Sequence, residues 1–154
     1  MADSIQRQVL DSVVTEITAL SLTGVSSGSI VVRKSPFDRD YVHMGITVSW
    51  DDNHEGPSRD SPTNLRDMIG YVVDIYDITG SGQGNTEAIT AIALRRQKIF
   101  RKFSRKRPTI TGDTDVNLVQ TTAKWGKPTV PKQYQENYDV SMISVTYWVL
   151  EPRS

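Results

Sequence analysis

The stretch NTEAITAIALRRQKIFRKFS, residues 85–104, predicts a helix with two very different sides. If each residue advances by about 100°, the apolar residues fall within one arc of about 140° and most cations fall opposite. That arc contains Ala88, Ile89, Ile92, Ala93, Ile99, Phe100 and Phe103. We therefore expect an amphipathic helix that packs on a sheet through its apolar side and presents cations to solvent.

The cationic side of this helix, with the residues just after it, is the most basic segment of the chain. Its predicted role is that of an interface, formed by Arg95, Lys98, Arg101, Lys102, Arg105, Lys106 and Arg107. Arg96 falls inside the apolar arc, where we expect it to pair with a carboxylate or to leave the core at its edge. The cations near the end of the helix also complement its dipole.

Charge is distributed unevenly along the 154 residues. The 18 basic and 18 acidic side chains cancel, but residues 95–107 hold 8 of the basic residues and none of the acidic ones. The rest of the chain therefore carries 10 basic and 18 acidic residues, a net charge of −8. A nucleic-acid binder usually keeps a basic surplus over the whole domain. One basic patch on an acidic body suits self-association or docking between subunits at least as well.

Strands are predicted on both sides of the basic helix. The preceding segment DMIGYVVDIYDI, residues 67–78, is apolar on both faces near its middle, as expected of a central strand. Residues 115–125 form a weaker strand whose expected partner is the β-branched and aromatic segment 138–150.

Earlier segments complete the set of elements. A helix is expected from Ser4 to Leu20, and a short strand over residues 29–34. Residues 42–50 alternate most regularly, which predicts one strand with five side chains on one face. These side chains are Val42, Met44, Ile46, Val48 and Trp50.

The order of elements predicts the fold class. Helix, three strands, helix and two strands, without helical crossovers between consecutive strands, indicate an α+β domain. We expect one domain over residues 1–154, with a mostly antiparallel sheet of about five strands covered by two helices. The long polar connections 51–66 and 126–137 exceed ordinary hairpin loops and are interpreted as arms that reach neighbouring subunits.

Composition excludes several classes of protein. No apolar run approaches the roughly 18 residues of a membrane span. The absence of cysteine excludes disulfides, thiolate metal sites and a cysteine nucleophile. The first ten residues show no basic segment followed by an apolar one, so no secretory signal is expected. These features favour a cytoplasm, or an assembly built in one, as the compartment.

Two short motifs resemble binding sites but fit a simpler interpretation better. Gly80, Gly82 and Gly84 precede the basic helix, yet their spacing is not that of a dinucleotide or P-loop, so a strand-to-helix linker capped by Asn85 or Thr86 is favoured. The possible metal ligands Asp51, Asp52, His54 and Glu55 lack the spacing of a calcium loop. They are interpreted as a solvated hairpin tip. His43 is interpreted as a surface or hydrogen-bonded residue, and neither a catalytic role nor a cofactor is expected.

Three kinds of partner would suit a basic helix. Nucleic acid would favour exposed aromatic residues for stacking, but Phe100 and Phe103 fall on the buried arc. A membrane would require a free apolar side, which the sheet needs as its cover. Docking to an acidic protein surface is therefore favoured.

The chain as a whole resembles the tail-completion or tail-terminator proteins of tailed bacteriophages. The resemblance rests on the N-terminal helix DSIQRQVLDSVVTEITAL, the proline-containing segment VVRKSPFDRDYVHMGITVSW, the helix NTEAITAIALRRQKIFRKF and the closing strand YDVSMISVTYWVLEPRS. The resemblance spans most of the chain and lies in the order of the elements and the general character of their sequences. No residue-level site is carried over from it.

The resemblance implies a structural, non-enzymatic role in the virion. Subunits of this family form a closed ring, usually of six, around the DNA channel in the phage neck. One ring face docks on the tail tube protein and the other on a head-completion ring, and DNA passes through the lumen without specific binding. Another head–tail connector or tail-tube subunit is an alternative, as is a small nucleic-acid-binding module that uses the basic helix.

Overall fold

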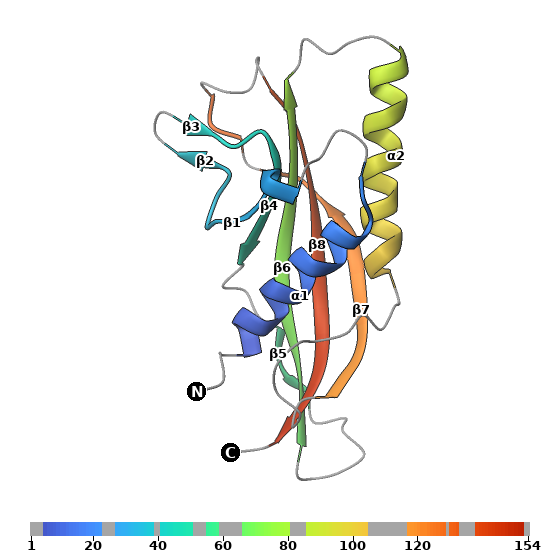
Figure 1. Cartoon of the computed structure of the whole chain (residues 1–154). Helices are drawn as coiled ribbons and strands as arrows, with labels where there is room; N and C mark the ends of the chain where they lie inside the picture. The colour runs from blue at the N-terminus through green and yellow to red at the C-terminus, as the bar shows by residue number, and fades with distance from the viewer. Residues whose placement is uncertain are drawn as a thin grey trace.

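Two helices lie on one face of a mostly antiparallel sheet. The computed structural model describes residues 5–22, 27–38, 41–50, 55–58, 66–80, 86–104, 117–128, 130–132 and 138–152. The helices are α1 (Ile5–Ala19) and α2 (Thr86–Phe103), and a short 3-10 turn, η1, spans Ser27–Ser29. Side chains from both helices join one core cluster with one face of the sheet. Figure 1 shows α1 crossing in front of the sheet and α2 along its side.

Within the described ranges, the main sheet has six strands. Five follow the spatial order β1 (Ile30–Val32), β4 (Gly45–Trp50), β6 (Arg66–Gly80), β8 (Tyr138–Pro152) and β7 (Asn117–Gly126). β5 (Glu55–Ser58) pairs with β6 beside this path. β1 and β4 are parallel, and the other pairs are antiparallel. The predicted α+β class and element order are confirmed.

The long ladder between β6 and β8 is the centre of the sheet. The two strands pair from Arg66 with Pro152 to Gly80 with Tyr138, so fifteen residues of each strand are in register. β-branched side chains meet across this ladder on the helix-covered face, as Ile75 does with Ile143. The prediction that residues 67–78 form a central strand is confirmed, and so is the pairing of the segment near 115–125 with the last strand.

The core fills the space between the helices and the sheet. α1 contributes Val9, Val13 and Ile17 at four-residue spacing, and all three are fully buried. α2 contributes Ile99 and Phe103, which are also fully buried. The opposite face of the sheet is more polar, with a hydrogen bond of 2.7 Å from Ser144 Oγ to Asp74 Oδ1.

The predicted single strand over residues 42–50 is wrong in its first half. Val42 belongs to a separate ribbon formed by β2 (Phe37–Asp38) and β3 (Tyr41–Val42), and β4 starts only at Gly45. The chain turns between them, where Gly45 has a φ of 122°. Met44 is consequently exposed, whereas Ile46 is buried as the alternation predicts.

The turn before β4 is fixed by contacts with the segment around Ser29. The carbonyl of Ser29 accepts a hydrogen bond of 2.7 Å from Nε2 of the buried His43. His43 is therefore a hydrogen-bonded residue, as predicted. The same carbonyl oxygen would lie 2.9 Å from a Cβ atom at position 45. A glycine is required there both by the backbone conformation and by this close approach.

The two long connections are described only in part. β5 lies inside the predicted arm 51–66 and pairs with β6, so the polar sequence there does not exclude a strand. Charged and proline-containing segments can serve as edge strands, which explains why composition alone missed it. Residues 51–54, 59–65, 129 and 133–137 lie outside the described residues.

We expect Gly45→Ala to lower the free energy of unfolding by about 1–3 kcal/mol, because an L side chain at this φ is strained and meets the Ser29 carbonyl. Gly28→Ala is the matched control, since a Cβ atom there has nothing within 4 Å. Urea denaturation followed by circular dichroism measures both variants. Equal stability of the two would contradict the assigned turn.

Tyr147 places a hydroxyl group in the core. Its side chain is fully buried, its ring centroid lies 6.2 Å from that of Phe103, and its hydroxyl has no hydrogen-bond partner among the described residues. Burial of the phenol, assisted by the nearby negative charge of Glu16, raises the pKa of Tyr147 far above its ordinary value. The folded protein therefore holds this proton more tightly than the unfolded chain does.

We expect Tyr147→Phe to be at least as stable as the original chain at neutral pH, because it removes a buried hydroxyl whose desolvation costs about 1–3 kcal/mol. The raised pKa makes the original chain lose stability as pH rises past the ordinary tyrosine value of about 10, where only the unfolded state releases the proton. The variant lacks this component. Urea titrations below and above that pH measure the free energy of unfolding of both proteins. If Tyr147→Phe is less stable than the original chain at both pH values, the hydroxyl group has a hydrogen-bond partner and the prediction is wrong.

Candidate docking surface on helix α2

Helix α2 is oriented differently from the sequence prediction. The most deeply buried of its described side chains are Arg95, Ile99 and Phe103, whereas Ala93 is exposed. On the helical wheel this shifts the buried arc by about 50°, half the rotation between neighbouring residues. Arg95, and not Ala93, therefore lies on the side of the helix that faces the sheet. The reason is a charged side chain of the sheet beneath the helix.

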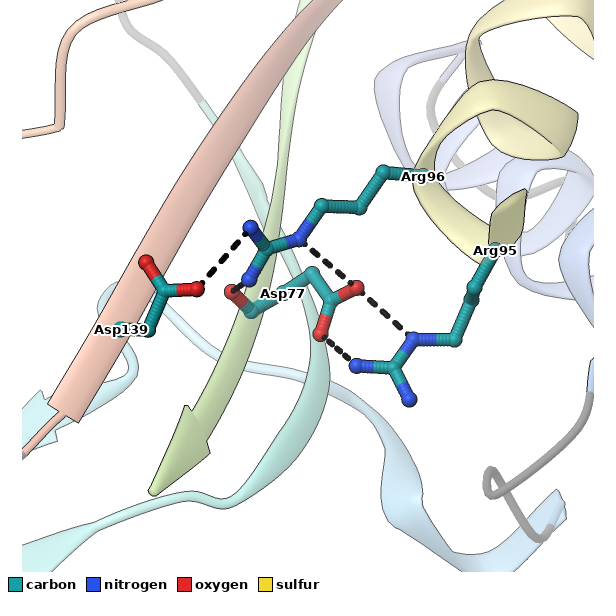
Figure 2. Close-up of polar contacts among 4 residues, drawn as sticks. All are labelled: Asp77, Arg95, Arg96 and Asp139. Atoms are coloured by element: carbon teal, nitrogen blue, oxygen red, sulfur yellow. Dashed lines mark hydrogen bonds and ion pairs between the residues drawn. The ribbon is translucent and has the colours of Figure 1, made fainter. Parts of the chain in front are cut away.

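Arg95 was predicted to face outward, and this prediction is wrong. Its guanidinium forms a two-pronged ion pair with Asp77 of β6, in which Nε donates to Oδ2 at 2.9 Å and Nη2 donates to Oδ1 at 2.6 Å. The side chains are 9% and 3% exposed, respectively. Arg95 therefore anchors the helix to the sheet and is not part of an outward surface. Figure 2 shows the two side chains meeting between helix and strand.

Arg96 pairs with carboxylates, as predicted. Its Nε donates to Asp77 Oδ2 at 3.3 Å and its Nη2 to the main-chain oxygen of Asp77 at 3.3 Å. Its Nη1 donates to Asp139 Oδ2 of β8 at 3.2 Å. The guanidinium therefore lies across the ends of two paired strands, with Asp139 on the outer side (Figure 2).

These four residues form a polar clamp of two arginines and two aspartates. Desolvating charges is expensive, so such a cluster persists only where each group has well-placed partners. Here the Asp77 carboxylate accepts from both arginines, and the charges balance. The planar guanidinium fork fixes direction as well as distance. The clamp therefore sets the rotation of α2 about its own axis.

Lys102 is partly withdrawn from the predicted outward surface. Its Nζ lies 3.0 Å from Oε2 of Glu16 on α1, and the lysine side chain is 35% exposed. This ion pair joins the two helices beside the buried ring of Tyr147. Lys98 and Arg101 are exposed, as predicted for interface residues. Arg105, Lys106 and Arg107 lie outside the described residues.

An exposed tryptophan lies beside the helix, and the sequence analysis missed it. Trp125 of β7 is 53% exposed and stacks on Phe100 of α2, with ring centroids 5.2 Å apart and planes within 2° of parallel. Its strand position pairs it with Ile143, so the Cβ of Trp125 lies on the helix-covered face of the sheet. The available signal was the period of two in β7, which places Trp125 with Ala123 and Thr121.

Other candidate sites remain without support from the described residues. No group of three or more histidine, cysteine, aspartate or glutamate side chains that could hold a metal ion occurs there. The glycine-containing linker joins β6 to α2 as predicted, but its residues 81–85 lie outside the described ranges, as does the cluster of residues 51–54. In the described part of the chain, no helix is long and apolar enough to cross a membrane.

Comparison with known proteins gives no assignment. No protein-family model matches the chain, and no curated protein matches it significantly.

We expect Asp77→Asn to lower the free energy of unfolding by about 3–5 kcal/mol, because it leaves the buried Arg95 without a compensating charge. Asp139→Asn is the control, since that carboxylate is 55% exposed and its pair with Arg96 is worth at most about 1 kcal/mol. Unfolding is measured in urea because urea is uncharged, whereas guanidinium chloride is a salt that would screen the ion pairs. Similar losses in both variants would show that the clamp does not anchor α2.

Proposed function

We propose that this chain is a structural subunit of the neck of a tailed phage. It would form a closed ring, usually of six copies, that ends the tail tube and joins it to the head-completion protein. It would assemble in the host cytoplasm and act in the virion. DNA would pass through its lumen without specific binding, and the role requires neither catalysis nor a cofactor.

The observation that carries the proposal is the division of α2 into an anchored side and an outward side. Ile99 and Phe103 are fully buried against the sheet, so the apolar side of the helix is already used. Lys98 and Arg101 remain exposed on the outer side. The rest of the chain is acidic, and a ring built head to tail brings two different surfaces of the subunit together. The excess of 18 acidic over 10 basic residues outside residues 95–107 supports that arrangement.

The resemblance of the chain to tail-terminator proteins supports the same role through element order. The described structure has a helix, strands, a second helix and two closing strands, which is the order on which the resemblance rests. Another virion connector or a tail-tube subunit would share these features.

A nucleic-acid-binding module is the candidate from a different class. The exposed Trp125 beside a cationic helix favours it, because aromatic side chains can stack on bases. Such a module would bind duplex or single-stranded DNA as an isolated protein, and its affinity would fall steeply with salt because phosphate contacts release counterions.

Electron microscopy of phage lysates tests the proposed neck role directly. Lysates that lack this protein should contain overlong tails, or tails separated from filled heads. Supplying the protein in trans should restore joined particles. Normal particles in its absence would exclude the neck role, and salt-sensitive DNA binding by the purified chain would favour the rival module.

We expect Lys98→Glu combined with Arg101→Glu to abolish restoration of particles while leaving the fold intact, because both side chains are exposed. Lys34→Glu combined with Lys132→Glu is the matched control, since it changes the net charge equally at two exposed positions away from α2. Particle counts by microscopy and circular dichroism of the purified variants provide the readouts. Full activity of the first variant would contradict docking through α2.

A further inference from the structure

In the described part of the chain, strand β7 has no partner strand along its outer side. β7 ends the spatial order of the main sheet and pairs with β8 along its inner side (Figure 1). Its pairing is regular from Gln120 to Gly126, since the bulge lies between Leu118 and Gln120. An edge of this kind presents a row of N–H and C=O groups to any extended segment that approaches it. β7 is therefore a candidate for strand addition.

The register of the sheet identifies which main-chain groups of β7 face outward. The N–H of Arg33 donates to the carbonyl of Val48 at 3.1 Å, so the main-chain groups of Val48 point to β1. This direction alternates along each strand and matches between hydrogen-bonded partners. When the alternation is followed from β4 through β6 and β8, the N–H and C=O of Ala123 and Trp125 point away from β8. Neither residue has a main-chain hydrogen bond on that side with another described residue.

The side chains along this edge differ between the two faces of the sheet. Ala123 and Trp125 lie on the helix-covered face, where Ala123 packs against the core. Trp125 is 53% exposed although its ring stacks on Phe100. Lys124 lies on the opposite face and is exposed. An added strand would therefore place side chains beside an aromatic ring on one face and beside a cation on the other.

The charge of Lys124 defines the chemistry of the strand that fits. No described carboxylate forms an ion pair with Lys124 or with the exposed Lys127 that follows β7. A lysine on an edge strand discourages pairing with other chains in general. Opposite charges on directly opposed residues of two strands attract each other, whereas like charges repel. The edge therefore favours a strand that has a carboxylate opposite Lys124.

We propose that the outer edge of β7 binds an extended acidic segment of another protein by strand addition. The segment has apolar side chains opposite Ala123 and Trp125, and a carboxylate between them, opposite Lys124. Its main chain exchanges hydrogen bonds with the outward N–H and C=O groups of Ala123 and Trp125. In this mode of recognition the main chain provides affinity and the alternate side chains provide specificity. The inference rests on the sheet edge alone and does not depend on the neck role.

A second copy of this chain matches the edge less well. Of the described strands at the edges of the main sheet, β1 and β7 contain no acidic residue. β5 begins with Glu55, but a glycine and Pro57 follow, and proline has no N–H to donate. None of these three strands places a carboxylate between two apolar side chains. The matching segment is therefore expected in another protein.

Amide hydrogen exchange of the purified full-length chain, followed by nuclear magnetic resonance, tests the inference. The probe is a short end-capped peptide in which valine and glutamate alternate. At saturation it should slow exchange of the Ala123 and Trp125 amides by about tenfold or more, because these N–H groups become hydrogen-bonded. An analogue that is N-methylated at its valines lacks the donors that face β7 and should not bind. Because this comparison changes only the peptide, it is independent of folding.

Two charge-reversal variants test the position of the contact. Lys124→Glu should weaken binding of the glutamate peptide by about fivefold or more, and it should favour a peptide with lysine in place of glutamate. Lys34→Glu is the matched control, since it makes the same charge change at an exposed residue that follows β1, at the opposite edge of the sheet. It should leave the binding of both peptides unchanged.

Three results would overturn the inference: no binding at millimolar peptide, equal binding of the N-methylated analogue, or exchange that slows only outside β7. Slower exchange of the Ala123 and Trp125 amides as the concentration of the chain alone rises would assign the edge to a second copy instead. Particle restoration in lysates is scored separately. Failure of strand addition therefore overturns this inference alone, whereas normal particles without the protein overturn the neck role.

Discussion

The carboxylate of Asp77 decides how helix α2 sits on the sheet. It is a charged group inside the core, and it is stable there because Arg95 meets both of its oxygens and Arg96 shares one of them. Since guanidinium groups must lie in the plane of the carboxylate to bond in this way, the helix cannot rotate without breaking buried ion pairs. The side chains that α2 shows to solvent follow from that constraint.

The β6–β8 ladder provides the carboxylates at the correct place. The register pairs Asp77 with Ser141 and Thr79 with Asp139, so the two aspartates stand near the same end of adjacent strands. They are separated by 62 positions in the chain, yet one arginine reaches both. Because the ladder between β6 and β8 has no bulge, its register fixes the position of Asp77 relative to Asp139. The clamp therefore depends on sheet register as much as on the helix.

Sequence patterns predicted the α+β class, both helices, the central strand and the carboxylate pairing of Arg96, because each follows from local periodicity. The predicted outward orientation of Arg95 is wrong, because a helical wheel sorts residues by polarity alone. It contains no information about the buried aspartate that lies under the helix. They missed Trp125 because its exposure depends on β7 lying at the edge of the sheet. β5 and the β2–β3 ribbon were missed because short, polar or proline-containing edge strands lack a strong alternating pattern.

The inward arginines also change what kind of interface the helix can form. The seven outward cations that the sequence predicts would favour binding dominated by charge, with the steep salt dependence of phosphate contacts. In the structure, Arg95 and Arg96 both pair with the buried carboxylate of Asp77 and Lys102 pairs with Glu16, which leaves Lys98 and Arg101 as the exposed cations described on α2. Two screened surface charges contribute little affinity by themselves. An interface on this helix must therefore gain most of its free energy from apolar contact, and Leu94 and Trp125 are the exposed groups that can provide it.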